Sequence, residues 1–295
     1  MCKKNKVAVL LAAYNGSKWI EEQINSILIQ KEVELHIFIS VDKSSDNTLD
    51  IVRDFSHKFN NITLLSYGDM FGGAGPNFYR LFRDVCFDEF DYVSLSDQDD
   101  IWNSNKLIES ISIVENTNSD AFSSDVVAFW EDGRKKYIKK SYNQKKYDYM
   151  FEAAGPGCTY LLKKKLAVSF AEFLIEKNKK KMMLPDLHDW LIYAFSRSRG
   201  FRWFIYDSPT MLYRQHSLNQ VGVNSGFKAI NKRIDLIKCG WYGNQINQMC
   251  FLLEIKSPTI TKSFIFFNFL NLRRRFIDSL VVLFFGVLGF LTFNM

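Results

Sequence analysis

Cysteine pairs, glycine-rich phosphate loops and prolines are missing or scarce in this 295-residue sequence. Its five cysteines include no C-x-x-C pair, which argues against a disulfide framework or thiolate zinc site and fits a reducing compartment. No loop after an expected strand reads G-x-G-x-x-G or G-x-x-x-x-G-K-[ST], which argues against a Rossmann dinucleotide site and a P-loop. With five prolines and 47% hydrophobic residues, the chain suits one large domain, or a core domain with appendages, rather than a disordered segment.

The first residues, MCKKNKVAVLLAAYNG, combine a basic start with a short apolar run, as secretory signals do. The apolar run, residues 7–13, is at the short end for such a signal, and the chain continues directly into SKWIEEQINSILIQ. There, apolar side chains fall at helical spacing at Trp19, Ile20, Ile24, Ile27 and Leu28. We therefore expect the strand, loop and helix that open a globular domain.

Positive charge is in excess, with a net charge of +6, and it is concentrated in three runs, RKKYIKK, KNKKK and RRR. No nucleic-acid-binding motif accompanies them, so we expect no nucleic-acid partner and interpret the first two as solvated surface. The last run, residues 273–275, lies beside an apolar tail, and this position favours contact with an anionic membrane surface.

The first hundred residues alternate between short apolar strands and amphipathic helices. The runs KVAVLLAAY, ELHIFISV, NITLLS and DYVSLS are too continuously apolar for strands with one solvated face. Helical patterns cover residues 18–30, 48–59 and 76–86. Such alternation predicts an α/β fold with right-handed crossovers and a mostly parallel sheet flanked by helices.

After Trp102 the pattern loosens. We expect a helix near 106–115, a strand near 121–130, a basic insertion to about 146, a small-residue loop at 153–160 and a helix at 163–177. A further helix, capped by Asp186 or His188, places four residues on its buried side, Trp190, Leu191, Ala194 and Phe195. Two short strands follow and end in LYRQH.

The tail from Ser257 onward holds almost no acidic residue and many phenylalanines. Its longest uncharged stretch, residues 279–293, has about fifteen residues, short of the roughly 20 needed to cross a bilayer core. We therefore expect an interfacial or re-entrant helix hairpin in preference to a true span, with a docked core helix as the alternative. If the tail inserts, residues 273–275 would hold the cytoplasmic side.

Ligand sites in parallel α/β sheets lie beyond the carboxyl ends of the strands, where this sequence places the polar loops YNGS, DKSSDNT and DQDD. Asp97 and Asp99 form a D-x-D, which suits Mg²⁺ or Mn²⁺ bridging a diphosphate, although an ordinary acidic turn is the alternative. Asp42 ends the second strand and suits a nucleobase or ribose contact. Ser45 or Asp46 suits a cap of the helix near Thr48, and FGGAGPNF suits a flexible loop.

Five motifs together, VAVLLAAYNGSKWIEEQINSIL, SVDKSSDNTLDIV, SLSDQDDIWNSNKL, HDW and YRQH, resemble the inverting family 2 glycosyltransferases of GT-A fold. They are most similar to the bacterial branch that contains rhamnosyltransferases of surface-polysaccharide assembly, and the resemblance covers roughly residues 5–222. Two positions depart from the family pattern. Lys43 stands where a glycine is common, and His188 stands beside Asp189 where an acidic pair is common.

The resemblance implies a role for each matching residue. Asp189 would be the general base, and Asp99 with His216 would hold Mg²⁺ or Mn²⁺, although a lone histidine is more often structural. Two further sets follow. Contacts to the nucleotide sugar are implied for Ala13, Tyr14, Asn15, Asp42, Ser44, Asp97 and Gln98. Acceptor-wall or orienting roles are implied for Asp100, Trp102, His188 and Arg214.

The sequence thus predicts a glycosyltransferase domain at 1–222, with a nucleotide-binding part to about 103 and an acceptor part at 104–222. A helical connector at 223–256 and a membrane-associating tail at 257–295 would follow. The expected reaction is inverting transfer of a hexose or deoxyhexose, with rhamnose favoured, from a nucleotide sugar to a glycan or polyprenyl-linked acceptor. It would serve capsule, exopolysaccharide, O-antigen or cell-wall synthesis at the cytoplasmic face of the cell membrane. A nucleotidyltransferase and a non-catalytic sugar-nucleotide or glycan-binding module remain the alternatives.

Overall fold

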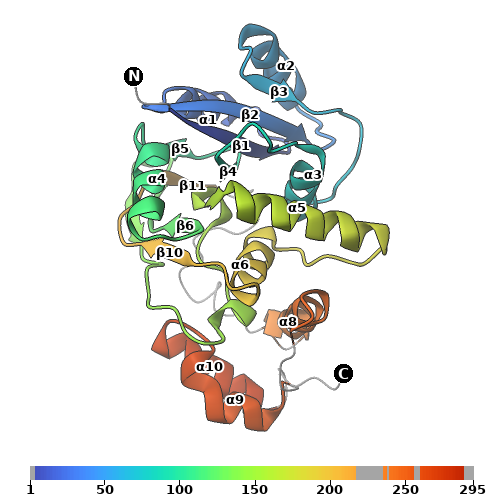
Figure 1. The fold of residues 1–295 in the computed structure, drawn as a ribbon, viewed down its shortest axis with the longest axis vertical. Helices are drawn as coiled ribbons and strands as arrows, with labels where there is room; N and C mark the ends of the chain where they lie inside the picture. Colours follow the sequence, from blue (N-terminus) through green and yellow to red (C-terminus); the bar gives the residue numbers. More distant parts are fainter. Residues whose placement is uncertain (1–3, 217–234, 238, 256–259, 289–295) are drawn as a thin grey trace.

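A computed structural model describes residues 4–216, 235–237, 239–255 and 260–288, and Figure 1 shows their arrangement. A seven-stranded sheet in the order β10-β6-β9-β4-β1-β2-β3 forms the centre. Its strands are β1 (Asn5–Ala13), β2 (Val33–Val41), β3 (Ile62–Leu64), β4 (Tyr92–Ser96), β6 (Ala121–Ser124), β9 (Leu161–Lys163) and β10 (Trp203–Tyr206). All neighbours in it pair in parallel except β9, which is antiparallel to β4 and β6. The predicted mostly parallel sheet is confirmed, and β9 was not foreseen because three residues carry no periodicity.

Helices cover both faces of this sheet because the strand side chains alternate between two apolar cores. Val7, Val9 and Leu11 of β1 belong to one core, whereas Ala8 and Leu10 belong to the other. The helices are α1 (Ile20–Leu28), α2 (Thr48–Lys58), α3 (Ala74–Asp84), α4 (Lys106–Asn116), α5 (Lys164–Lys179) and α6 (His188–Ser198).

A second, four-stranded sheet lies beside the first, and it contains β5 (Ile101–Trp102), β11 (Met211–Gln215), β7 (Val126–Trp130) and β8 (Lys135–Ile138) in that order. The single strand predicted at 121–130 is wrong, because the chain leaves the large sheet at Asp125. That side chain is buried, and its carboxylate accepts hydrogen bonds from Lys140 N, Ser141 N (2.8 Å) and the Tyr137 hydroxyl. The predicted basic insertion therefore contains β8 and folds back onto Asp125.

Side-chain caps were predicted at the starts of α6 and α2, and the structure agrees with only part of this. Neither Asp186 nor His188 caps α6, which starts after Leu187 without a side-chain capping bond, so that prediction is wrong. The four residues expected on the buried side of α6 are buried, which confirms its orientation. At α2, Asp46 accepts a hydrogen bond from Thr48 N (3.1 Å), although the residue at the cap position is Asn47.

The C-terminal helices lie at the end of the molecule opposite β3 and α2 (Figure 1). They are α8 (Trp241–Leu252), α9 (Lys262–Asn268) and α10 (Phe276–Val287), with a 3₁₀ turn η3 (Phe269–Asn271) between the last two. The predicted helix pair is therefore present, and its buried residues Ile265 and Leu272 join the same apolar core as Tyr193 of α6. The predicted boundary at residue 222 lies outside the described residues.

Within the ranges that the structure describes, none of the helices is both long enough and apolar enough to cross a membrane.

The arginine run at 273–275 was expected to contact lipid headgroups, and for two of its members this is wrong. The Arg274 backbone N–H donates to Glu152 Oε1 (2.6 Å), and its guanidinium donates to Ala153 O (2.6 Å). The Arg273 guanidinium donates to Phe151 O (2.8 Å). Both side chains turn inward because Glu152 supplies a counter-charge that an exposed arginine would lack, and only Arg275 remains half exposed.

Candidate active site

The loops after β1 and β4 are joined by Gln98. Its side-chain oxygen accepts from Tyr14 N (2.7 Å), and its side-chain nitrogen donates to Tyr14 O (2.8 Å). A side chain at Gly16 would collide with the same amide, so any larger residue there would displace the group that holds Tyr14. The backbone of Tyr14 is thereby fixed while its ring is 53% exposed, an arrangement that suits stacking on a planar base.

The loops after β1 and β2 are joined in the same way. Asn15 adopts a left-handed conformation (φ 46°), which asparagine tolerates better than most residues. Its backbone N–H donates to Ser44 Oγ (3.0 Å), and its side-chain oxygen accepts from Ser45 N (2.8 Å). Ser44 Oγ in turn donates to Asp42 O (2.9 Å). Ala13 O accepts from Asp42 N (2.8 Å), so the predicted donor-side residues form one connected rim.

Asp42 organises a third loop at this rim. Its carboxylate accepts from the backbone N–H groups of Lys43 (2.7 Å), Phe71 (2.9 Å) and Gly72 (3.0 Å). The glycine-rich loop, expected to be flexible, is therefore tied to the end of β2. Asp42 is almost fully buried. It therefore holds the loop in place, whether or not it also contacts a ligand.

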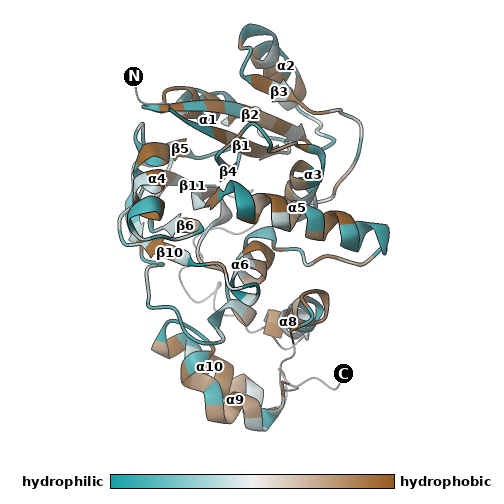
Figure 2. Cartoon of the chain, in the orientation of Figure 1, coloured by the Kyte–Doolittle hydropathy of each residue, from teal (hydrophilic) through white to brown (hydrophobic). Residues whose placement is uncertain are grey.

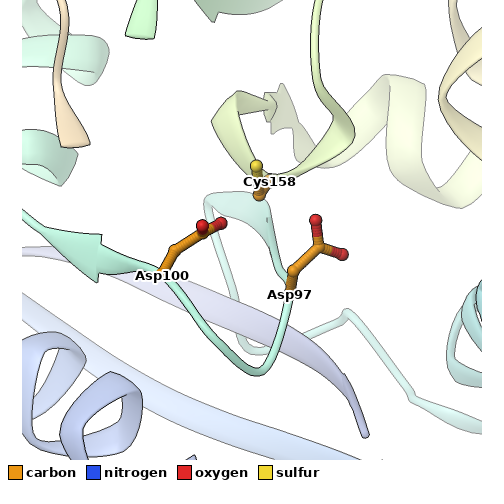
Figure 3. Close-up of side chains that lie close together, drawn as sticks. All are labelled: Asp97, Asp100 and Cys158. Atoms are coloured by element: carbon orange, nitrogen blue, oxygen red, sulfur yellow. The ribbon is translucent and has the colours of Figure 1, made fainter. Parts of the chain in front are cut away.

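Three carboxylates gather in the turn after β4, where Asp97, Asp99 and Asp100 lie in sequence. Burial, reinforced by the charge of Asp99, raises the pKa of Asp97 to about 7. Burial also raises the pKa of Asp100, whose Oδ1 accepts from Arg214 N (3.0 Å). Figure 3 shows Asp97 and Asp100 on the two sides of this turn with Cys158 on the loop facing them, and their ligand atoms lie within 4.8 Å of one another.

This turn fits a divalent cation. His216 Nε2 lies 2.6 Å from Asp99 Oδ2, and its ring stacks on Trp19 with the ring centroids 3.9 Å apart. The second oxygen of Asp100, Oδ2, is buried and has no hydrogen-bond partner among the described residues. Carboxylate oxygens and a histidine nitrogen are suitable ligands for Mg²⁺ or Mn²⁺, and a cation here would offset the negative charge that burial makes costly.

Arg214 and Trp102 support the acidic turn from behind. The Arg214 guanidinium donates to Asp99 O (2.7 Å) and pairs with Glu22. Trp102 is buried, and the ammonium of Lys106 lies 3.6 Å from the centroid of its ring. Burial lowers the pKa of Lys106 to about 7. Sequence reasoning missed Lys106, because a lysine at the start of a helix is normally solvated.

Asp189 lies in the first turn of α6. Burial raises the pKa of its carboxyl to about 6, while its Oδ1 accepts from Trp190 N (2.8 Å). A carboxylate with a pKa close to neutrality is suited to take a proton. The charge of Asp189 also contributes to the raised pKa of Asp97, so the two carboxyl groups are close enough to interact.

His188 is buried beside Asp189, and its ring stacks on Phe78 with the centroids 4.0 Å apart. Burial lowers its pKa to about 3, so the imidazole is neutral. A side chain at Gly157 would place Cβ 2.6 Å from His188 Nε2 and 3.2 Å from Asp189 Cβ. The loop that carries Cys158 therefore packs directly on the start of α6, a contact that no sequence pattern indicated.

The sequence is similar to known proteins along most of its length. A sequence-family model described as "Glycosyltransferase like family 2" matches residues 4–181. The chain is 42% identical to the dTDP-rhamnosyl transferase RfbG of Shigella flexneri, over 92% of this chain and 97% of that protein.

Two solved structures share the fold. TarS of S. aureus in complex with UDP-GlcNAc superposes with a TM-score of 0.53 at 17% identity, over 83% of this chain and 72% of that one. The mannosyltransferase PcManGT from Pyrobaculum calidifontis in complex with GDP-Man and Mn²⁺ superposes with a TM-score of 0.51 at 12% identity, over 98% and 88%.

Proposed function

The chain belongs to glycosyltransferase family 2, and from this premise we propose that it is an inverting rhamnosyltransferase with dTDP-rhamnose as donor. The observation that carries the proposal is its similarity to the Shigella dTDP-rhamnosyl transferase along nearly the whole of both chains. As a glycosyltransferase it is neither a nucleotidyltransferase nor a non-catalytic binding module. We further propose that its acceptor is a growing bacterial surface glycan carried on a polyprenyl lipid.

In the proposed reaction Asp189 is the general base. Its carboxylate takes the proton of the acceptor hydroxyl while that oxygen attacks the anomeric carbon from the side opposite the phosphate. The bond from the anomeric carbon to the phosphate oxygen breaks, and the nucleoside diphosphate leaves with the electron pair. Supporting this role, Asp189 begins a helix, where the helix dipole favours its ionised form.

The donor is held by the rim described above. Tyr14 would stack on the base, and the groups around Asp42, Asn15 and Ser44 would contact the nucleoside. Asp99 and His216 would hold Mg²⁺ or Mn²⁺, with Asp97 in reach of the ribose or the metal's water shell. When bound, the cation would neutralise charge on the departing diphosphate.

A donor panel tests this proposal. We expect thermal unfolding of the purified protein to shift upward with dTDP-rhamnose or dTDP in the presence of Mn²⁺ or Mg²⁺, because a ligand bound only by the native state stabilises it. UDP and GDP sugars, and dTDP without metal, should give smaller shifts. Rhamnose release or transfer measured with the same panel reports the reaction itself. A metal-dependent shift with another nucleotide alone would reassign the donor, and transfer of another sugar would reassign the product.

We also propose that the enzyme works at the cytoplasmic face of the membrane, held there by α9, η3 and α10. Figure 2 shows hydrophobic residues along both helices. Lys146 is exposed on the neighbouring segment, whose Tyr147 N donates to Asn271 O (3.0 Å), and it suits an anionic lipid surface. The exposed apolar side chains, here called the hairpin face, are Phe266, Phe267, Leu270, Phe276, Ile277, Leu280, Val281, Phe284, Val287 and Leu288.

Changing Phe267, Phe276 and Phe284 together to glutamine should release the protein from anionic phospholipid vesicles. Each exposed phenylalanine loses about 1.5–3 kcal/mol of apolar burial, so we expect at least a ~100-fold weaker partition in a sedimentation assay. Substitution is preferable to deletion because Ile265 and Leu272 of this region are core residues.

The matched control changes two exposed apolar residues outside the hairpin face, Ile29 and Met183, to glutamine. This control should bind vesicles as the wild type does. If the triple variant sediments as strongly as the control, the hairpin face is not the membrane contact.

A further inference from the structure

Lys140 lies in the basic run that sequence reasoning assigned to solvated surface, yet its side chain packs on Gly155, which one buried hydroxyl links to the proposed general base. We propose that Lys140 is a positioning residue for Asp189, a fixed cation that holds the base carboxylate ionised and oriented toward the acceptor hydroxyl. This inference rests on the proposed role of Asp189. Lys140 lies outside every sequence motif that identified the site.

The backbone around Lys140 is anchored by a buried carboxylate. Asp125 accepts from Lys140 N and from Ser141 N (2.8 Å), and its other oxygen accepts from Ser141 Oγ (2.9 Å) and the Tyr137 hydroxyl. A charged group that receives this many hydrogen bonds is strongly held. The backbone of Lys140, just after β8, is therefore held in a defined position, unlike that of a lysine on a free loop.

The side chain of Lys140 packs on the loop that leads to Cys158. A Cβ built on Gly155 would lie 3.7 Å from both Cβ and Cγ of Lys140, so the aliphatic stem lies against that glycine. The Tyr160 hydroxyl bonds to Gly155 O (3.1 Å) and also to Asp189 O (3.3 Å). The buried Tyr160 hydroxyl thus links Gly155, on which the lysine side chain packs, to Asp189.

The electrostatics agree with this placement. Burial raises the pKa of Asp189, and the Lys140 ammonium, together with the Trp190 N–H, opposes that rise. Among the described residues, the other titratable groups that interact with Asp189 are an acid, a neutral histidine and two tyrosines. Asp97 faces it from the turn after β4, the neutral His188 precedes it, and two buried tyrosines approach it, Tyr79 from α3 and Tyr160 from the loop after η2 (Gly157–Thr159).

In the reaction Lys140 exchanges no proton. Its ammonium stabilises Asp189 as the carboxylate before transfer, and the acceptor proton ends on Asp189. The neighbouring Lys139 is exposed, and its ammonium lies 5.4 Å from the ring centroid of Tyr142. Lys139 carries the same charge one residue away without reaching the base, which makes it the matched control.

The test compares Lys140→Met, Lys140→Arg and Lys139→Met in pH profiles of kcat and kcat/KM for rhamnose transfer. A base must be ionised, so wild-type activity should fall as pH drops through about 6. In Lys140→Met the acid limb should move up by about one pH unit, because an opposite charge near a carboxyl shifts its pKa by about that much or more. KM for the donor should stay unchanged.

Lys140→Arg should restore the wild-type profile, and Lys139→Met should keep it. An unchanged acid limb in Lys140→Met, from a protein with the wild-type unfolding temperature, would overturn the inference. So would a uniform loss at every pH that arginine does not rescue, which would mark a purely structural lysine. If the wild type transfers no sugar from any donor, the proposed function fails instead, and the two failures are thus separate.

Discussion

Asp189→Asn should lower kcat for rhamnose transfer by about 10²–10⁴-fold, the usual contribution of a positioned general base. The asparagine amide has nearly the same shape as the carboxylate and keeps the side-chain oxygen that accepts a hydrogen bond from Trp190 N–H (2.8 Å). It cannot, however, take up a proton from the acceptor hydroxyl. The acceptor oxygen must then attack without losing its proton. Because Asp189 is proposed to act only on the acceptor, the metal-dependent thermal shift with dTDP should remain. Initial rates at saturating donor measure kcat, and the thermal shift with dTDP and metal measures donor binding.

The matched control is Asp186→Asn, three residues earlier in the chain, on the loop before α6. Asp186 is exposed and accepts from Trp241 Nε1 (3.2 Å), so its replacement should leave kcat within about twofold, as for other surface changes. If Asp189→Asn retains more than a tenth of the wild-type rate, another group is the base. If it also loses the dTDP shift, Asp189 acts on donor binding or on the fold.

Asp99→Asn should abolish the metal-dependent part of donor binding and lower kcat by at least ~10²-fold. The cation is proposed to supply several kcal/mol of charge stabilisation, and each 1.4 kcal/mol is about tenfold in rate. The amide presents a weaker, neutral ligand beside His216. Titrations of Mn²⁺ in the presence of dTDP, followed by thermal unfolding, give the apparent metal affinity directly.

Asp88→Asn is the control for this change, because Asp88 is an exposed carboxylate on the loop before β4. It should bind Mn²⁺ and dTDP as the wild type does. Wild-type metal affinity in Asp99→Asn would show that the cation is held elsewhere, and Asp97 with Asp100 and Cys158 would then be the next group to examine.

The nucleotide half of the fold was predictable because each element there has enough length to show its period. The nine residues of β1 send alternate side chains to two cores, and Ile20, Ile24 and Ile27 of α1 repeat at helical spacing and are fully buried. Polar residues at the strand ends then had to meet at one sheet edge. This is why the loops after β1, β2 and β4 meet, with Gln98 bonded to Tyr14 and Asp42 N bonded to Ala13 O.

The second half was harder to predict because its decisive contacts are tertiary. Nothing near Asp125 marks a change of sheet, since the carboxylate that breaks the strand is satisfied by residues about fifteen positions away. Arg273 and Arg274 belong to a charge run that indicates lipid contact, and only the fold places Glu152 beside them. Cys158 lies in a loop of small residues without periodicity, so its approach to Asp97 and Asp100 has no local cause.

The inward turn of Arg273 and Arg274 also bears on which acceptors the enzyme selects. These residues bind the hairpin to the segment that ends beside α6, and Arg273 further donates to the Tyr242 hydroxyl (2.9 Å) of α8, whose ring stacks on Trp190. If the hairpin face lies on lipid as proposed, these contacts would hold Asp189 at a fixed height above the bilayer. A lipid-linked glycan with too few or too many sugars would then present its terminal hydroxyl below or above the base, and the enzyme would select chain length without contacting the sugars between.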